Sequence, residues 1–143
     1  MSAEPAAVDV WLERTRARIN RVGPDQAAQL VERGALLVDT RPVEQRRRHG
    51  EVPGALVVDR NVLEWRLDPT CPYRLADIDW PEAPAQPVFV VFCQEGYSSS
   101  LAVASLLDVG LGQVHDLEGG FEAWAAQGLP IRQVTEPDEE RLQ

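Results

Sequence analysis

The residue types best suited to chemistry lie together in one short stretch, which begins at Cys93 and reads Cys-Gln-Glu-Gly-Tyr-Ser-Ser-Ser. The stretch follows an apolar run at residues 88–92 and precedes a segment of helical character, so a strand-to-helix loop is expected. Backbone N–H groups in such a loop, with the dipole of the following helix, favour a thiolate over a thiol. Gly96 permits a tight turn because glycine adopts a positive φ without steric cost. The stretch therefore predicts a nucleophilic cysteine in an anion-binding loop.

Short apolar strands alternate with helices along the chain and must position this loop. Apolar runs predict strands at residues 35–38, 55–58 and 88–92, and one more short strand is expected at residues 113–115. Helices are expected at residues 6–20, from Pro24 to a stop at Gly34, and at residues 43–48, 61–67, 99–109 and 119–124. The proline-rich run at residues 68–87 predicts a long surface loop. The alternation indicates an α/β fold with a central parallel sheet and helices on both faces, in which ligands bind at the carboxyl ends of strands.

Length and composition restrict the class of protein. The 143 residues are 44% hydrophobic and carry 14 basic against 23 acidic side chains, a net charge of −9. One folded domain is expected, and a disordered chain, a collagen and a disulfide scaffold are excluded. The acidic balance argues against nucleic acid as a partner, and 2 cysteines with 2 histidines leave little room for a zinc site. With no membrane-spanning apolar run and no signal-peptide pattern, we expect a cytoplasmic protein with reduced cysteines.

Five segments of the chain match, in order, the motifs of one known family. They are Leu-Val-Asp-Thr-Arg at 37–41, Gly-Glu-Val-Pro-Gly-Ala at 50–55, Val-Val-Phe-Cys-Gln-Glu-Gly-Tyr-Ser-Ser at 90–99, Leu-Ala-Val-Ala-Ser-Leu-Leu at 101–107 and Leu-Glu-Gly-Gly-Phe-Glu-Ala-Trp at 117–124. In these motifs the chain resembles the single-domain rhodanese-like sulfurtransferases. The resemblance implies a rhodanese-like domain at residues 22–132, with an N-terminal helical extension at residues 1–21 and a flexible acidic tail at residues 133–143.

The resemblance implies an enzyme, a sulfurtransferase that uses no cofactor and no metal. Cys93 would take a sulfane sulfur from a donor, hold it as a persulfide, and pass it to a thiophilic acceptor. The donor would be a small sulfur compound or a persulfidated protein, and the acceptor a thiol or cyanide. The implied substrate-binding positions are Gln94, Glu95, Gly96, Tyr97, Ser98, Ser99 and Arg41.

Two positions at the mouth of the loop depart from the family pattern, because Glu95 and Tyr97 stand where the family is often basic. A carboxylate there is expected to repel thiosulfate, a dianion, by about 1 kcal/mol near a surface. We therefore predict that thiosulfate is a poor donor and that a less anionic persulfide serves instead. Arg41 either locks the end of its strand together with Asp39 or faces the pocket.

Several further side chains are assigned mainly structural roles. The arginines at residues 46–48 are interpreted as a solvated helix face, with guidance of an acidic partner toward the pocket as the alternative. Cys71 is either a spare loop cysteine or a partner that resolves Cys93 as a disulfide. The tryptophans are expected to fill core gaps or cover the loop at Trp65, Trp80 and Trp124, and to dock the N-terminal helix at Trp11.

Other interpretations of the cysteine remain open at this level. A phosphatase or arsenate-reductase-like site needs an arginine six residues after the cysteine, and Ser99 stands there, so no planar cation would clamp a tetrahedral oxyanion. A non-catalytic or redox-sensing interaction module would keep the fold and use the thiol only as a sensor. A lone cysteine after a strand can also be simply a small buried side chain. Uptake of a sulfur atom by Cys93 would separate the transferase from these alternatives.

Overall fold

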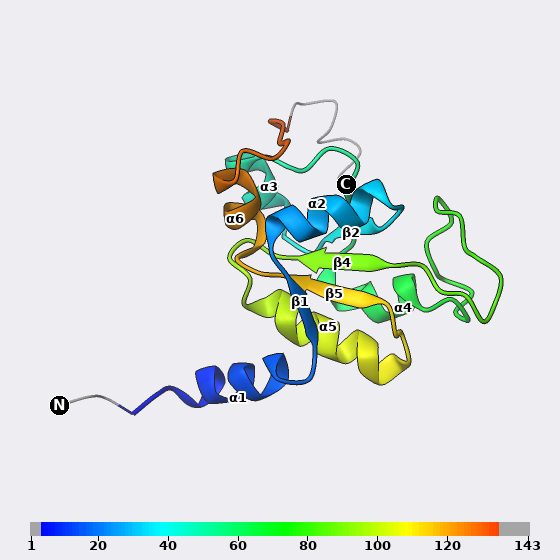
Figure 1. Ribbon diagram of the computed structural model, residues 1–143, viewed down its shortest axis with the longest axis horizontal. Coiled ribbons are helices and arrows are strands. Elements are labelled where there is room, and N and C mark those ends of the chain that lie inside the picture. The colour runs from blue at the N-terminus through cyan, green and yellow to red at the C-terminus, as the bar shows by residue number, and fades with distance from the viewer. Residues whose placement is uncertain (1–3, 135–143) are drawn as a thin grey trace.

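A five-stranded parallel sheet forms the centre of the protein in a computed structural model, which describes residues 4–134. Its strands are β1 (Asn20–Val22), β2 (Leu36–Asp39), β3 (Leu56–Val57), β4 (Phe89–Phe92) and β5 (Val114–Leu117). They lie in the order β1-β5-β4-β2-β3, and each neighbouring pair is parallel. Helices cover both faces of the sheet (Figure 1), which confirms the predicted α/β architecture.

Six helices and one 3-10 turn surround the sheet within the described residues. They are α1 (Ala7–Arg16), α2 (Pro24–Glu32), α3 (Val43–His49), η1 (Arg60–Val62), α4 (Leu63–Leu67), α5 (Ser98–Val109) and α6 (Gly120–Ala126). In Figure 1, α2, α3 and α6 lie above the sheet, and α4 and α5 lie below it. Nowhere in residues 4–134 does a helix reach the length and apolar character that crossing a membrane requires.

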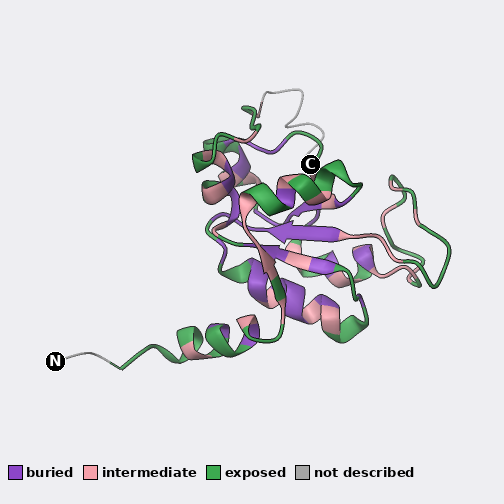
Figure 2. Cartoon of the chain, viewed as in Figure 1, coloured by how far each residue is buried: buried purple, intermediate pink, exposed green. Residues whose placement is uncertain are grey.

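The central strand β4 anchors the core, and all of its residues are buried (Figure 2). Phe89 and Val91 pack in the cluster formed with α4 and α5, whereas Val90 and Phe92 pack in the cluster formed with α2 and α6. Successive side chains of a strand point to opposite faces, so a strand covered on both sides must be apolar throughout. This burial accounts for the unbroken apolar run that precedes Cys93.

The N-terminal segment departs from the helix predicted at residues 6–20. The helix α1 ends at Arg16, and Asn20–Val22 forms β1, which extends the sheet by pairing with β5. The pairing partner lies far along the chain, so no local pattern could reveal the hydrogen bonds that make this segment a strand. The expected boundary between the extension and the domain therefore falls inside β1. Residues 135–143 of the predicted tail lie outside the described residues.

Among the tryptophans, Trp124 is buried, Trp80 is partly buried, and Trp11 and Trp65 are exposed. Trp80 meets Phe89 in an edge-to-face contact, and Trp124 is buried, as expected. Trp11 is 56% exposed, so the prediction that it docks the N-terminal helix is wrong. Trp65 is 57% exposed, which excludes the first of its two expected roles, the filling of a core gap. The buried residues of α1 are instead Leu12 and Thr15, on a helix that lies against α5.

The long loop at residues 68–88 lies beside the amino end of β4, at the right of Figure 1. The side chain of Gln86 fastens this loop to the segment before β5 by accepting the N–H of Gly112. Cys93 follows the carboxyl end of β4, at the other end of the sheet, and both Cys71 and Cys93 are free cysteines. The placement therefore gives no support to Cys71 as a resolving partner of Cys93.

Candidate active site

Cys93 lies directly after β4 and is a buried residue, 7% exposed. Its Sγ accepts the backbone N–H of Gly96 at 3.2 Å and that of Ser99 at 3.4 Å. The Ser99 N–H belongs to the first turn of α5, the end of a helix where the backbone dipole is positive. Both donors stabilise negative charge on the sulfur, as the sequence predicts for an anion-binding loop.

The loop takes this shape because two glycines let two turns meet. Gly96 has φ +92°, and a Cβ there would lie 2.8 Å from the nitrogen of Gly119. A Cβ on Gly120 would lie 2.4 Å from the carbonyl oxygen of Cys93. The close approach lets the first turn of α6 donate to the loop, through Phe121 N–H to the Cys93 carbonyl at 2.9 Å. The carbonyls of Cys93 and Gln94 therefore point toward α6, and the Gly96 and Ser99 N–H groups point toward the sulfur.

A cavity of about 260 Å³ opens over Cys93 and contains most of the predicted binding positions. Its walls are formed by Thr40, Arg41, Pro42, Gln45, Gln94, Glu95, Tyr97 and Ser98. Glu95 and Tyr97 are exposed at this mouth, whereas Gly96 and Ser99 contact the sulfur from behind. The structure thus brings the predicted residues together around one sulfur atom.

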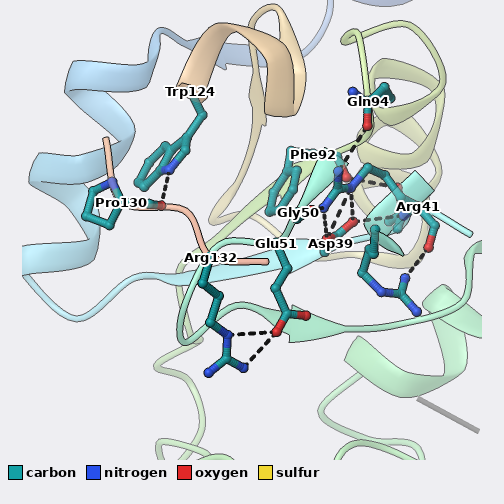
Figure 3. A network of polar contacts seen from close by, with 11 residues as sticks. Asp39, Arg41, Gly50, Glu51, Phe92, Gln94, Trp124, Pro130 and Arg132 are labelled. Atoms are coloured by element: carbon teal, nitrogen blue, oxygen red, sulfur yellow. Dashed lines mark hydrogen bonds and ion pairs between the residues drawn. The ribbon is translucent and has the colours of Figure 1, made fainter. Parts of the chain in front are cut away.

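The guanidinium of Arg41 is hydrogen-bonded to other residues of the protein, as Figure 3 shows. Its Nε and Nη2 donate to the carboxylate of Asp39, and its Nη1 donates to Gln94 Oε1 at 2.9 Å. Nη2 also donates to the carbonyl of Gly50 at 2.8 Å, and Cζ of Arg41 lies 4.1 Å from the centre of the Phe121 ring. These contacts match the interpretation of Arg41 as a lock on the strand end, although the residue also lines the cavity wall.

A second arginine on this side corrects an expectation from the sequence. Arg46, predicted as part of a solvated helix face, is only 4% exposed, and its guanidinium donates to the carbonyl oxygen of Arg41. The position is buried because α3 begins directly after the strand-end turn and turns this side chain back onto it. Arg47 and Arg48 are exposed, as expected.

Behind the sulfur lies a polar network that the sequence did not reveal. Ser99 Oγ lies 3.3 Å from Cys93 Sγ and donates to Asp116 Oδ1 at 2.6 Å, and Ser100 Oγ donates to Asp116 Oδ2 at 2.5 Å. Asp116 is fully buried in β5 and pairs with Arg21 Nε at 2.9 Å. One signal in the sequence could have indicated Asp116, because it is an acidic residue at the carboxyl end of a buried strand. The strand predicted at residues 113–115 ends one residue before it.

The N-terminal helix reaches the same network through Arg16. Its Nη2 donates to the carbonyl of Gly96 at 2.7 Å, and its Nε donates to Ser100 Oγ at 3.1 Å. The guanidinium also lies 5.7 Å from the centre of the Tyr97 ring. Arg16 of α1 therefore stabilises the loop around Cys93, although α1 is not part of the β4–loop–α5 segment that contains this loop.

The histidines take no part in this arrangement. His49 is exposed, and His115 precedes Asp116 in β5. Burial lowers the pKa of His115, because its charged form would lose hydration. Among the described residues, no hydrogen-bond partner meets its buried Nδ1 atom. His115 is therefore a candidate for pH-dependent stability and lies outside the contacts of the sulfur.

Comparison with known proteins places the chain in a family. The model of the rhodanese-like domain matches residues 23–127. The chain therefore belongs to the rhodanese-like domain family, as its motifs indicated. Arg16 and Arg21 lie before the matched segment, so the network at Asp116 includes residues from outside it.

One curated relative supports this assignment, and two solved structures share the fold. A thiosulfate sulfurtransferase GlpE from Pseudomonas savastanoi is 34% identical over 106 residues, which are 74% of this chain and 87% of the relative. A protein of unknown function from Rhodopseudomonas palustris, described as a possible tyrosine phosphatase, has a TM-score of 0.74 at 30% identity and covers 92% and 98% of the two chains. The polysulfide-sulfur transferase homodimer from Wolinella succinogenes shares the fold at a TM-score of 0.65 and 20% identity, over 90% and 88%.

Proposed function

We propose that this protein is a sulfurtransferase in which Cys93 carries a sulfane sulfur as a persulfide. The observation that carries the proposal is the pair of backbone N–H groups, from Gly96 and Ser99, that donate to the Cys93 sulfur. Membership of the rhodanese-like family and the likeness to a thiosulfate sulfurtransferase support sulfur transfer as the general reaction.

Loading of the cysteine is a displacement at sulfur. The Cys93 thiolate attacks the outer sulfur of a donor R–S–SH, the donor's S–S bond breaks, and R–S⁻ leaves with the electron pair. The new S–S bond leaves Cys93 as a persulfide, Cys93–S–SH. The N–H groups of Gly96 and Ser99 hold the attacking sulfur in place and offset its charge.

Unloading reverses the roles of the two sulfurs. An acceptor thiolate attacks the outer sulfur of the persulfide, the S–S bond to Cys93 breaks, and the Cys93 thiolate is the leaving group. The same two N–H groups then stabilise the charge that develops on the departing Cys93 sulfur. A site that stabilises the thiolate therefore assists transfer out of the site as well as loading.

The charge at the mouth favours a donor with little negative charge. Glu95 is exposed on the cavity wall, and the guanidinium of Arg41 is engaged by Asp39, Gln94 and the Gly50 carbonyl. Thiosulfate brings two negative charges past this carboxylate, whereas a hydropersulfide brings one or none. We infer that a persulfide, on a small molecule or a protein, is the preferred donor.

Steady-state sulfur transfer tests the proposal. The protein is incubated with thiosulfate or a low-molecular-weight hydropersulfide as donor, and with cyanide or a dithiol as acceptor. We expect transfer with the hydropersulfide, loss of transfer in Cys93→Ser, and retention in Cys71→Ser, which removes the other cysteine. Equal transfer by Cys93→Ser would overturn the assignment of the nucleophile.

The contacts of Ser99 favour sulfur transfer over phosphatase chemistry. A cysteine phosphatase places an arginine six residues after its cysteine to clamp the phosphate. Here that position is Ser99, whose hydroxyl donates to the buried carboxylate of Asp116. An anion at Cys93 would therefore meet a carboxylate behind the loop rather than a guanidinium. Absence of phosphate release from an aryl phosphate, measured beside the transfer assay, is the expected result.

A further inference from the structure

Asp116 is linked to Cys93 through a single hydroxyl group. We propose that Asp116 is a positioning residue that turns the Ser99 hydroxyl hydrogen away from Cys93 and thereby limits how far the loop stabilises the thiolate. The proposal deepens the proposed function because it concerns the same cysteine. Its test uses alkylation, which needs no sulfur donor.

The direction of the hydrogen bonds follows from the donors at each end. Arg16 Nε occupies a lone pair of Ser100 Oγ, so the Ser100 hydrogen is free to point to Asp116 Oδ2 at 2.5 Å. Arg21 Nε donates to the same Oδ2 atom at 2.9 Å. Both donors fix Oδ2 as an acceptor, which leaves Oδ1 to face Ser99.

The Ser99 hydroxyl has one hydrogen and two possible acceptors for it. Asp116 Oδ1 lies 2.6 Å from its hydroxyl oxygen, and Cys93 Sγ lies 3.3 Å away. A carboxylate oxygen is the stronger acceptor, so the hydrogen goes to Asp116 and a lone pair faces the sulfur. In this orientation the Ser99 oxygen can accept a hydrogen bond from the Cys93 thiol, but it has no hydrogen to donate to the thiolate. The resting thiol is therefore favoured on this side, while the Gly96 and Ser99 N–H groups favour the thiolate on the other.

The other charges around Cys93 are few within the described residues. From α1 comes Arg16, from β1 Arg21, and from β5 Asp116 itself, while Arg41 and Glu95 line the cavity on the far side of the sulfur. The two arginines nearest to Asp116 contact it or its serine partner. The Ser99 hydroxyl is the part of the network that touches the sulfur, so the effect of Asp116 passes through it.

A balance of this kind suits a sulfur nucleophile. A thiolate that is stabilised too strongly loses nucleophilicity, and the best attacking thiol titrates near the ambient pH. A carboxylate behind the loop keeps the donors from over-stabilising the thiolate.

The substitution Asp116→Asn gives a directed change. Oδ2 must remain an acceptor for Arg21 and Ser100, so the amide NH₂ of Asn faces Ser99 and turns its hydrogen toward Cys93. One hydrogen bond to the thiolate is thereby gained. We expect the pH midpoint of Cys93 alkylation by iodoacetamide, measured in a Cys71→Ser background, to fall by about one pH unit.

A double-mutant comparison tests whether the effect passes through Ser99. In a Ser99→Ala background there is no hydroxyl to turn, so Asp116→Asn should shift the midpoint by less than about a third of its effect in the parent protein. An equally large shift in both backgrounds would show that Asp116 acts directly by its charge, and it would overturn the proposal. So would an unchanged midpoint, or a rise, in a folded Asp116→Asn protein.

Ser99→Ala alone provides the second variant, because Asp116→Asn alters a buried ion pair with Arg21 and could reduce folding. Ser99→Ala keeps that pair and removes the acceptor of the S–H. We expect a smaller fall of the midpoint, with a melting temperature close to that of the parent. No fall at all in Ser99→Ala would contradict the proposal even if Asp116→Asn cannot be purified. If the midpoints shift as expected while no sulfur transfer is found, the proposed function fails and the positioning role stands.

Discussion

Two buried carboxylates flank the strand that leads to Cys93. Asp39 ends β2 and Asp116 lies in β5, the neighbours of β4 on either side. Both are fully buried, and each pairs with an arginine nitrogen at 2.9 Å. Their other partners differ in kind, and this difference separates a structural role from a chemical one.

The partners of Asp39 are local and do not include a hydroxyl that touches the sulfur. Arg41, two residues further along the chain, donates to it from the backbone N–H and from the guanidinium. The partners of Asp116 come from distant segments, and two of them are hydroxyl groups. A hydroxyl can reverse its hydrogen bond, whereas a guanidinium only donates. The carboxylate bound through hydroxyls is therefore the one that can influence Cys93.

The largest expected effect on stability is that of Asp39→Asn. The substitution leaves the guanidinium of Arg41 buried without its charge partner, which costs about 3–5 kcal/mol of unfolding free energy. Urea unfolding measures the loss. The alkylation midpoint of Cys93 is expected to stay within about 0.3 pH units of the parent in protein that remains folded, because the lock does not touch the sulfur. A shift as large as that of Asp116→Asn would erase the distinction between the two carboxylates.

A smaller effect is expected on the other side of the sheet, at Arg16. Arg16→Gln removes a charge-assisted hydrogen bond to the Gly96 carbonyl and another to Ser100. We expect kcat/KM for sulfur transfer to fall roughly tenfold, because the loop around Cys93 loses a partly buried contact. Arg14→Gln, on the exposed face of the same helix, is the matched control and should leave kcat/KM unchanged. Equal losses of kcat/KM in both variants would show that the contacts of Arg16 with the loop have no specific role in sulfur transfer.

An exposed carboxylate extends the comparison to the cavity mouth. Glu95→Gln removes a repulsion of about 1 kcal/mol for thiosulfate, which corresponds to about a fivefold rise in kcat/KM with this donor. The rate with an uncharged hydropersulfide should change little. Glu82→Gln, in the loop at the other end of the sheet, serves as the control. Unaltered thiosulfate turnover in Glu95→Gln would count against the inferred donor preference.

The smallest effect concerns His115, the neighbour of Asp116 in β5. Burial places its folded pKa below its ordinary value, so the unfolded chain takes up the proton first as the pH falls. Its contribution to stability is complete above about pH 6.5 and declines as the pH falls toward the folded pKa. We expect His115→Gln to flatten the pH dependence of the melting temperature in this window, with His49→Gln as an exposed control. An unchanged slope would place the pH dependence elsewhere.

The sequence is informative where the structure is local and apolar. Runs such as residues 88–92 predict buried strands because both faces of the sheet are covered, and the loop from Cys93 to Ser99 is contiguous in the chain. The pairing of β1 with β5 and the contacts of Asp116 are not local. Arg16 and Ser100 lie 84 residues apart, and Arg21 and Asp116 lie 95 apart. No spacing pattern in the sequence indicates that such distant residues are in contact. The loop around Cys93 was therefore predicted, but the contacts of Arg16, Arg21 and Asp116 behind it were not.

Burial also explains which single residues were misjudged. Arg46 belongs to a basic run that is typical of a solvated helix, yet the Arg41 carbonyl requires a donor inside the turn. Trp11 was predicted to dock the N-terminal helix, but the face of α1 that meets α5 carries Leu12 and Thr15. Side-chain type alone does not decide which face of a short helix is covered.

Intact-protein mass spectrometry tests the central claim most directly. The protein is reduced, incubated with a hydropersulfide donor, freed of excess reagent, and measured beside Cys93→Ser and Cys71→Ser. We expect a gain of one sulfur atom in the parent and in Cys71→Ser, no gain in Cys93→Ser, and loss of the added sulfur when a thiol acceptor is supplied. No gain in a parent protein whose Cys93 still reacts with iodoacetamide would contradict the account and favour a sensing role for this thiol.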